Sequence, residues 1–426
     1  MQTMKYDMHT LKNGLRIVLV PMQESTTATV VVMTGTGSRY ENKKENGLAH
    51  FLEHMFFKGT KKRKNARIIS SELEAVGSVY NAFTSKDQTA YWAKVSKQYL
   101  DTALDVLSDM FLNSVLVSKE IAKERGTIIQ EIDMYEDMPM RNIGDVFETL
   151  IFGAEHPLGR TTTGPKENIR KFSRKDFIEY VKRNYTPDNT VVCIAGSFST
   201  SKVLAKIHKE FGRVKRANQP VLVPFIDTQN EPRVFIKQKK TDQTQLMLGV
   251  HGYPYLHKDE YALAVLSTIL GSGMSSRLFI EVREKRGLAY SVRSWAETFP
   301  DTGYFVVQAG IEHGEVQKVI KTILTEFRKI KKENVSASEL EKAKSYIKGT
   351  TTLSLETSDG VATDAASSLT TIGKIRALDE ILKNIDKVTA ADIKRVACDI
   401  LRTEKLNLAL IGPHLEKEKF LPLLRI

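Results

Sequence analysis

Residues 47–60 read GLAHFLEHMFFKGT, and this stretch decides how the rest of the chain is interpreted. His50 and His54 are four residues apart, so a helix would place both imidazoles on one face with Glu53 beside them. A catalytic zinc ion usually takes three protein ligands and keeps one position open. The stretch therefore supplies two ligands and a carboxylate that can take a proton from water, while the third ligand is missing. The alternative is a buried helix with two hydrogen-bonded histidines.

The order H-x-x-E-H is the inverse of the commoner H-E-x-x-H motif, and it is known as the inverzincin signature. Length and composition indicate a globular protein of two or more domains, because 426 residues exceed one ordinary core and 41% hydrophobic content is ample for packed domains. No apolar run approaches the length of a membrane span, and the first twenty residues lack the pattern of a signal peptide. The only cysteines, Cys193 and Cys398, lie in apolar segments. We expect a protein of the reducing cytoplasm that is neither exported nor bound to a membrane.

The net charge of +12 raises the possibility of nucleic-acid binding. The lysines, however, are spread along expected helices in runs such as 329–332, which are more often solvated faces. We therefore expect no nucleic-acid partner.

The elements around the motif alternate between strands and helices. Asn13-Gly14 lies between two segments of alternating residues, 6–11 and 15–20, which is the strongest local signal for a β-hairpin. A stripe of apolar residues in 99–113 indicates a helix that packs on the core. The expected strands are 6–11, 15–20, 29–34, 80–84 and 88–95, and the other expected helices are 66–76 and 118–137.

The helix at 118–137 carries two glutamates of interest. Glu124 and Glu131 are seven residues apart, so they lie almost above one another on the helix. Near a metal motif they are candidates for a ligand and for a supporting carboxylate. From their spacing alone, two solvated surface glutamates are the better interpretation.

The second half of the chain repeats the first at an offset near 210 residues. Residues 77–80 (GSVY) align with 287–290 (GLAY), and 120–123 (EIAK) align with 339–342 (ELEK). The segment 213–233 is rich in proline and has few helix signals, which is typical of a linker. We predict an α+β protein with two homologous α/β-sandwich halves of mainly antiparallel sheet, residues 1–215 and 233–426, joined by a linker at 216–232.

Only the first half carries the metal motif. The polar residues at positions 50, 53, 54, 124 and 131 of the first half are all replaced at the corresponding positions of the second half. Because they are lost together, we expect them to form one site, which favours a functional role for Glu124 and Glu131. The second half has its own pair, Arg283 and Tyr290, which without further context is a surface arginine and a strand tyrosine. At the repeat offsets, His50, Glu53 and His54 correspond to Glu260, Leu263 and Ala264, and Glu124 and Glu131 correspond to Ala343 and Thr350.

Taken together, the chain resembles the pitrilysin or insulinase family of zinc peptidases, in particular the short branch with mitochondrial processing peptidase subunits and their bacterial relatives. The resemblance covers nearly the whole chain, as a series of blocks in the same order. These blocks are NGLR at 13–16, GSRYE at 37–41, the motif helix, NAFT at 81–84, HPLGR at 156–160 and the segment from SRL at 276–278 to Tyr290.

The resemblance implies one zinc ion per chain, bound by His50, His54 and Glu131. It implies that Glu53 is the general base and that Glu124 is a supporting carboxylate. The sequence at Asn81 and Ala82 matches the edge strand along which substrates of this family lie.

Arg283 and Tyr290 match the arginine and tyrosine that reach the substrate from the opposite half of a clamshell, with the tyrosine steadying an oxyanion. Because one chain carries both sets, the resemblance implies a homodimer whose sites are completed in trans. The expected activity is zinc-dependent endopeptidase action on peptides or short unfolded segments. A non-catalytic peptide-binding or assembly subunit of the same fold is the alternative, and a nucleic-acid binder comes third.

Overall fold

The computed structural model describes residues 5–214 and 221–426, which divide into two compact units. The first unit comprises residues up to Ile132, Thr161–Val223 and Thr352–Leu378. The second unit comprises Asp133–Arg160, Pro224–Thr351 and Asp379–Ile426. Each unit is built on one mixed sheet with helices packed on both of its faces.

The sheet of the first unit has the strand order β1-β2-β6-β3-β5-β4, which leaves β4 at one edge. Its neighbouring strands are antiparallel except for the parallel pair β2 and β6. The predicted hairpin at Asn13-Gly14 is confirmed, and Gly14 has the positive φ of 91° that the turn requires. The strands are β1 Asp7–Thr10, β2 Arg16–Pro21, β3 Thr27–Thr34, β4 Val79–Thr84, β5 Thr89–Ser96 and β6 Thr190–Gly196.

One face of this sheet packs against the metal-motif helix and its neighbours, whose apolar side chains form a single core with the sheet. The predicted helices of this region are confirmed, with ends that differ from the expected ones by two residues at most. The helices of this side are α1 Leu48–Phe56, α2 Ala66–Glu74, α3 Leu100–Asn113, α4 Ser118–Asp137, α6 Lys166–Lys171, α7 Arg174–Asn184 and α8 Thr200–Phe211.

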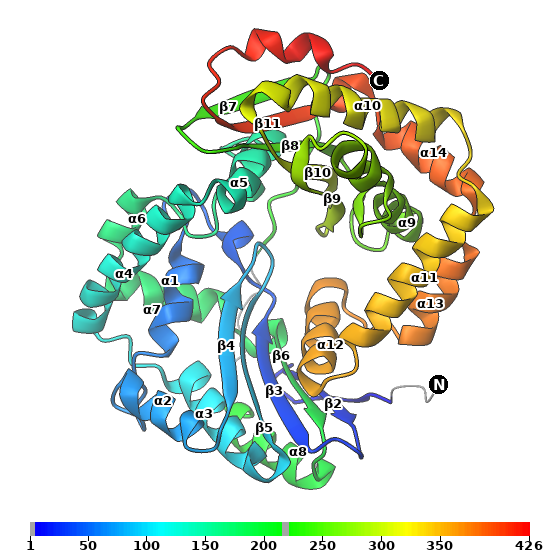
Figure 1. Ribbon diagram of the computed structural model, residues 1–426. Helices are drawn as coiled ribbons and strands as arrows, with labels where there is room; N and C mark the ends of the chain where they lie inside the picture. The colour runs from blue at the N-terminus through cyan, green and yellow to red at the C-terminus, as the bar shows by residue number, and fades with distance from the viewer. Residues whose placement is uncertain (1–4, 215–220) are drawn as a thin grey trace. The chain divides into compact units, whose positions relative to one another are not determined.

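The opposite face of the first sheet is covered by α12, Ser358–Ile372, which lies against β2, β3 and β6 (Figure 1). Small residues such as Ala362 and Ala366 bring this helix close to the sheet and form a second core with Val18 and Val31. As a result, residues 17–20 of β2 are all buried, although an alternation of buried and exposed residues was expected. A strand covered on both faces has no reason to alternate.

The second unit repeats the topology of the first. Its strand order is β7-β11-β8-β10-β9, again with one parallel pair, β7 and β11, and antiparallel pairs elsewhere. One face is covered by α5 Pro139–Phe152, and the other by a larger helical core. The remaining elements are β7 Arg233–Gln238, β8 Thr244–His251, β9 Ala289–Thr298, β10 Gly303–Ile311, β11 Asn407–Gly412, α9 Glu260–Gly271, α10 Val316–Lys332, α11 Ala337–Ser354, α13 Leu378–Lys387 and α14 Ala390–Ile400.

The compact units differ from the contiguous ranges 1–215 and 233–426 expected from the sequence. Helix α5 comes from the first half of the chain but belongs to the second unit, and α12 comes from the second half but belongs to the first. The physical reason is that a helical apolar stripe shows that one face is buried, but it does not show which sheet buries it. Residues 216–220 of the expected linker lie outside the described residues.

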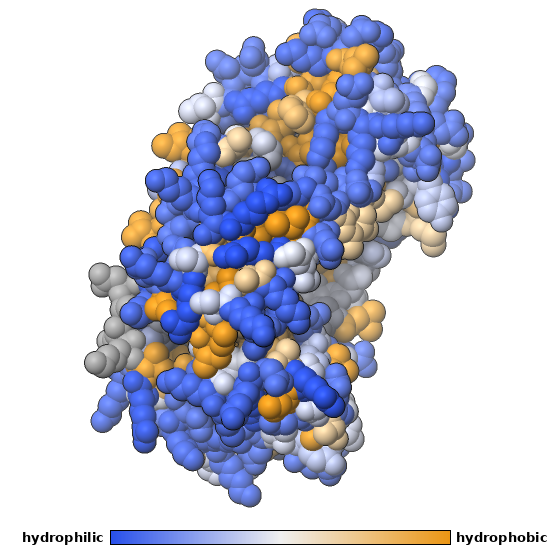
Figure 2. Space-filling model, turned by 90° about the vertical axis from the view of Figure 1, so that its left-hand side faces the viewer, coloured by the Kyte–Doolittle hydropathy of each residue, from blue (hydrophilic) through white to orange (hydrophobic). Residues whose placement is uncertain are grey.

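The hydrophilic character of the surface agrees with the sequence, in which charged residues are spread along the chain. Figure 2 shows a face that is mostly hydrophilic, on which the hydrophobic side chains form separate patches. Within residues 5–214 and 221–426, every helix is too short or too polar to cross a membrane.

Candidate metal centre

Helix α1 begins at an unusual cap. Gly47 has a φ of 100°, and the side chain that caps the helix comes from Glu41, six residues earlier. The Glu41 carboxylate accepts hydrogen bonds from the backbone N–H of Gly47 at 2.9 Å and of Ala49 at 2.5 Å, and from the Asn46 amide at 3.2 Å. The pKa of Glu41 is raised to about 8, because the effect of burial is larger than that of these hydrogen bonds, which lower the pKa. The start of the metal-motif helix is thus fixed by a buried side chain.

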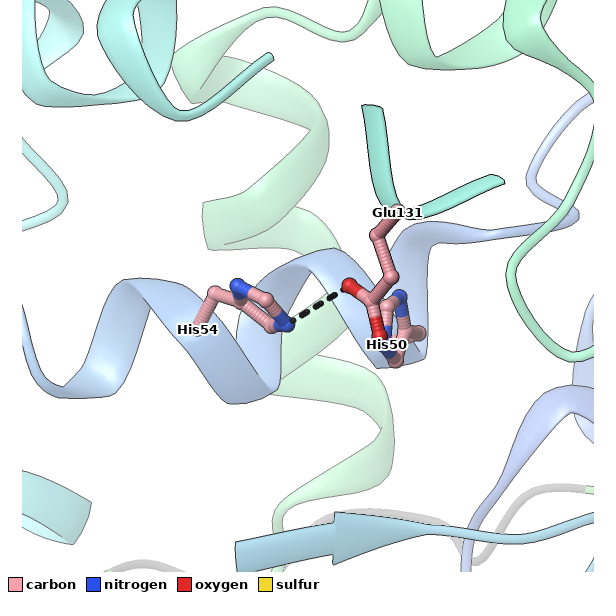
Figure 3. A group of neighbouring side chains, drawn as sticks. All are labelled: His50, His54 and Glu131. Atoms are coloured by element: carbon pink, nitrogen blue, oxygen red, sulfur yellow. Dashed lines mark ion pairs between the residues drawn. The ribbon is translucent and has the colours of Figure 1, made fainter. Parts of the chain in front are cut away.

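The structure brings His50, His54 and Glu131 together. Figure 3 shows Glu131 reaching from another helix, α4, toward both imidazole rings on α1. The Nε2 atom of His50 lies 3.6 Å from Glu131 Oε1, and the Nε2 atom of His54 lies 3.4 Å from Glu131 Oε2. The three ligand atoms lie within 4.8 Å of one another, and no other group of this kind occurs among the described residues.

These residues fit a zinc ion. Ligands bound at 2.0–2.2 Å with tetrahedral angles lie about 3.4 Å apart, close to the distances from Glu131 to the two rings. Two imidazole nitrogens and one carboxylate are also the ligand set of several catalytic zinc sites, which leave a fourth position open. The close approach of these three side chains is therefore what a bound zinc ion requires.

A second carboxylate supports His54 from its other side. Glu124 Oε1 lies 3.0 Å from His54 Nδ1, and Glu124 Oε2 lies 2.7 Å from the Lys58 ammonium. Burial raises the pKa of Glu124, but the hydrogen bonds from His54 and Lys58 outweigh it and hold the pKa below its usual value. Burial by itself would lower the pKa of His54. The neighbouring carboxylates of Glu124, Glu131 and Glu53 outweigh this effect, so the pKa of His54 is raised above its usual value. Glu124 is therefore a buried partner of the site and not a solvated surface residue.

Glu53 lies on α1 between the two histidines in sequence. Its Oε2 accepts a hydrogen bond of 2.6 Å from the Thr84 hydroxyl at the end of β4. Burial raises the pKa of Glu53, while Thr84 and the two histidines lower it. A carboxylate with a raised pKa holds a proton more strongly than an ordinary one, which suits a group that takes a proton from water.

Sequence analysis missed two residues of this site, Lys58 and Thr84. Lys58 follows His54 by four residues, two beyond the end of α1, so its closeness to the motif in the sequence was a usable signal. Thr84 had no such signal, because only the packing of α1 against β4 brings it to Glu53.

The two residues expected to bind substrate lie on the edge strand. Asn81 is exposed and Ala82 is half-buried on β4, which pairs with β5 on one side only. The Ala82 N–H donates a hydrogen bond to the Asn81 side chain at 2.9 Å. An edge strand of this kind is a site at which an extended peptide can add as a further strand.

Arg283 and Tyr290 belong to the second unit and lie next to each other. The Arg283 guanidinium lies 5.2 Å from the centre of the Tyr290 ring and 4.8 Å from that of Phe279. The Tyr290 side chain is 76% exposed at the start of β9. This pair therefore presents a phenol and a cation together at the surface of its unit.

Comparison with protein-family models gives two matches that follow each other along the chain. Residues 16–166 match the model of the insulinase family, peptidase family M16, and residues 171–347 match the peptidase M16 inactive domain. The first match contains the histidines and glutamates of the candidate site, and the second contains Arg283 and Tyr290.

Relatives with similar sequences extend over nearly the full chain. The chain is 36% identical to an uncharacterized zinc protease of Bacillus subtilis, over 95% of this chain and 98% of that protein. It is 35% identical to an uncharacterized zinc protease of Streptomyces coelicolor, over 96% and 90% of the two chains. Among solved structures, a protease from Helicobacter pylori is 28% identical and superimposes with a TM-score of 0.90, covering 96% of this chain and all of that one.

Proposed function

The chain belongs to the insulinase family, peptidase family M16, and from this premise we propose that it is a zinc-dependent endopeptidase that cleaves peptides or short unfolded segments. The observation that carries the proposal is the group of His50, His54 and Glu131, whose ligand atoms lie within 4.8 Å of one another, with each imidazole nitrogen within 3.6 Å of a Glu131 oxygen. In this proposal each chain binds one zinc ion.

In this proposal the residues around the site have separate roles. When bound, zinc supplies Lewis-acid chemistry, which polarises a carbonyl group and makes water more acidic. Glu53 takes the proton from the attacking water and passes it to the leaving amine. Thr84 fixes the orientation of the Glu53 carboxylate through its hydrogen bond, and Glu124 fixes the His54 ring.

The substrate in this proposal is an extended chain. It adds to the free edge of β4 at Asn81 and Ala82 through main-chain hydrogen bonds, which require an unfolded backbone but no particular side chain. This mode of binding favours peptides and unfolded segments over folded proteins.

We further propose a homodimer in which Arg283 and Tyr290 of one protomer complete the site of its partner, with Tyr290 steadying the oxyanion. Support comes from the presence of both residue sets in one chain and from the exposure of Tyr290. The two free cysteines, Cys193 and Cys398, are compatible with the cytoplasmic location that we expect.

The main test is cleavage of a peptide mixture by the purified protein, with and without a chelator, with the products read by mass spectrometry. We expect cleavage that the chelator stops and that zinc restores. Glu53→Gln should retain zinc and lose at least a hundredfold in kcat/KM, whereas Glu131→Ala should lose zinc and Glu124→Ala should lose less of it. If Glu53→Gln still turns over substrate, the base is wrongly assigned. A wild-type protein that binds peptides without cleaving them would instead favour the non-catalytic subunit.

The dimer has its own test. A mixture of Glu53→Gln and Tyr290→Phe protomers contains mixed dimers with one site that has both residues intact, if the sites are completed in trans. Activity should therefore reappear on mixing two inactive variants. Two variants that stay inactive after subunit exchange would rule out completion in trans.

A further inference from the structure

Lys58 lies two residues beyond the end of α1, in the loop that follows the metal-motif helix. Its ammonium group contacts Glu124 Oε2 at 2.7 Å, and the other oxygen of Glu124 contacts His54 Nδ1 at 3.0 Å. The Glu124 side chain is only 5% exposed, whereas the Lys58 side chain is 26% exposed. Lys58 is therefore at the outer end of a chain of contacts that leads through a buried carboxylate to a candidate metal ligand.

The chemistry of these contacts fixes the tautomer of His54. An ionised carboxylate only accepts hydrogen bonds, so the His54 nitrogen that faces Glu124 must carry the proton. In the neutral ring the other nitrogen, Nε2, then has its lone pair free, and this is the atom that faces Glu131. A metal ligand must present such a lone pair, so the orientation of Glu124 bears directly on metal binding.

We propose that Lys58 is a positioning residue for the metal, because it holds the Glu124 carboxylate in the orientation that makes His54 Nε2 a ligand. The inference rests on the proposed zinc binding of this site. Lys58 commits one oxygen of Glu124, which leaves the other for His54. Without the ammonium, the buried carboxylate loses its permanent cation and is free to turn away from His54.

A simpler role for Lys58 would be that of one more lysine in a basic loop. Lys62 offers the matched control, because it lies in the same loop and pairs with Asp105 at 2.5 Å. Asp105 contacts Arg63 and does not contact the candidate ligands in the described residues. Loss of Lys62 therefore removes the same charge and a more exposed ion pair without touching the chain of contacts to His54.

The test measures zinc affinity by competition with a fluorescent chelator, in full-length wild-type protein and in Lys58→Met, Lys58→Arg and Lys62→Met variants. Loss of a residue that orients a metal ligand typically weakens metal binding by 10- to 100-fold, and we expect a loss of about this size for Lys58→Met. Lys58→Arg keeps the cation and should remain within a few-fold of wild type, and Lys62→Met should not change the affinity. Cobalt-loaded Lys58→Met should also show an altered visible spectrum, which a merely structural change elsewhere would not produce.

Unfolding in urea with chelator present checks that each variant is folded, and Lys58→Gln serves if Lys58→Met is not. Unchanged zinc affinity in a folded Lys58→Met or Lys58→Gln protein would overturn the inference, and so would an equal loss in Lys62→Met. Failure of the proposed activity would look different: wild-type protein would bind zinc without cleaving peptides, and the affinity series could still be read.

Discussion

Acidification from pH 7.5 to 5.5 should destabilise this protein through His251, a residue of the second unit far from the metal motif in sequence. His251 ends β8 and packs against the rings of Phe152 and Phe225, with centroids 5.9 and 5.2 Å away. Burial lowers the pKa of His251 from 6.5 to about 4, and Asp227, whose carboxylate lies 3.6 Å away, only partly opposes this. The native state therefore keeps His251 neutral in a pH range in which the unfolded chain takes up a proton.

The sign and the size of the effect follow from linkage. Between the native pKa of about 4 and the unfolded value of 6.5, the unfolded state binds more protons, so stability falls as the pH falls. At pH 5.5 the protonated form of His251 exceeds the neutral form about tenfold in the unfolded chain. In the native protein His251 is almost entirely neutral at this pH. This difference corresponds to about 1 kcal/mol, and at pH 7.5 it is close to zero.

The assay is urea unfolding of wild-type protein and His251→Phe at both pH values. A chelator is present so that bound metal does not differ between the samples. Phenylalanine keeps the ring packing but cannot titrate, so wild type should lose about 1 kcal/mol more than the variant between pH 7.5 and 5.5. The other titrating groups are shared by the two proteins, and Asp227, which faces His251, has a lowered pKa and stays ionised between these pH values. Equal losses in the two proteins, or a larger loss in the variant, would refute the reasoning.

Three further variants probe the first unit. Arg63→Met should cost about 3 kcal/mol in urea unfolding, because the buried guanidinium pairs with Glu72, Asp105 and Asp109, and of these carboxylates only Asp105 keeps a second cation, Lys62; a cost below 1 kcal/mol would contradict this. Glu41→Gln should cost about 2 kcal/mol by the same measurement in chelator, since an amide cannot accept all the hydrogen bonds that cap α1; unchanged stability would show that the cap is dispensable. Thr84→Val should lower kcat/KM about tenfold with zinc content unchanged, because Glu53 loses the hydrogen bond that orients it; full activity would remove Thr84 from the site.

The sequence alone determined the parts of this protein that depend on local spacing. Two histidines four residues apart define one face of a helix, and an Asn-Gly pair between segments of alternating residues defines a hairpin, whatever the rest of the chain does. Self-similarity also predicted two related halves, and the five strands of the second sheet repeat the order of parallel and antiparallel pairs that the first sheet has from β2 to β4. The helix face and the hairpin could be predicted because each depends on hydrogen bonds or side-chain directions within a few residues, and the repeat because it can be found by comparing the chain with itself.

Tertiary structure decided what local spacing leaves open. Glu124 and Glu131 have the same spacing on a solvated helix as in a site, and only the packing of α4 beside α1 buries Glu124 against His54 and brings Glu131 to both rings. The sequence also could not predict that α5 belongs to the second unit and α12 to the first, because an apolar stripe on a helix does not specify which sheet it packs against. The contact of Thr84 with Glu53 likewise joins residues distant in sequence, which are set side by side only by the global packing of the core.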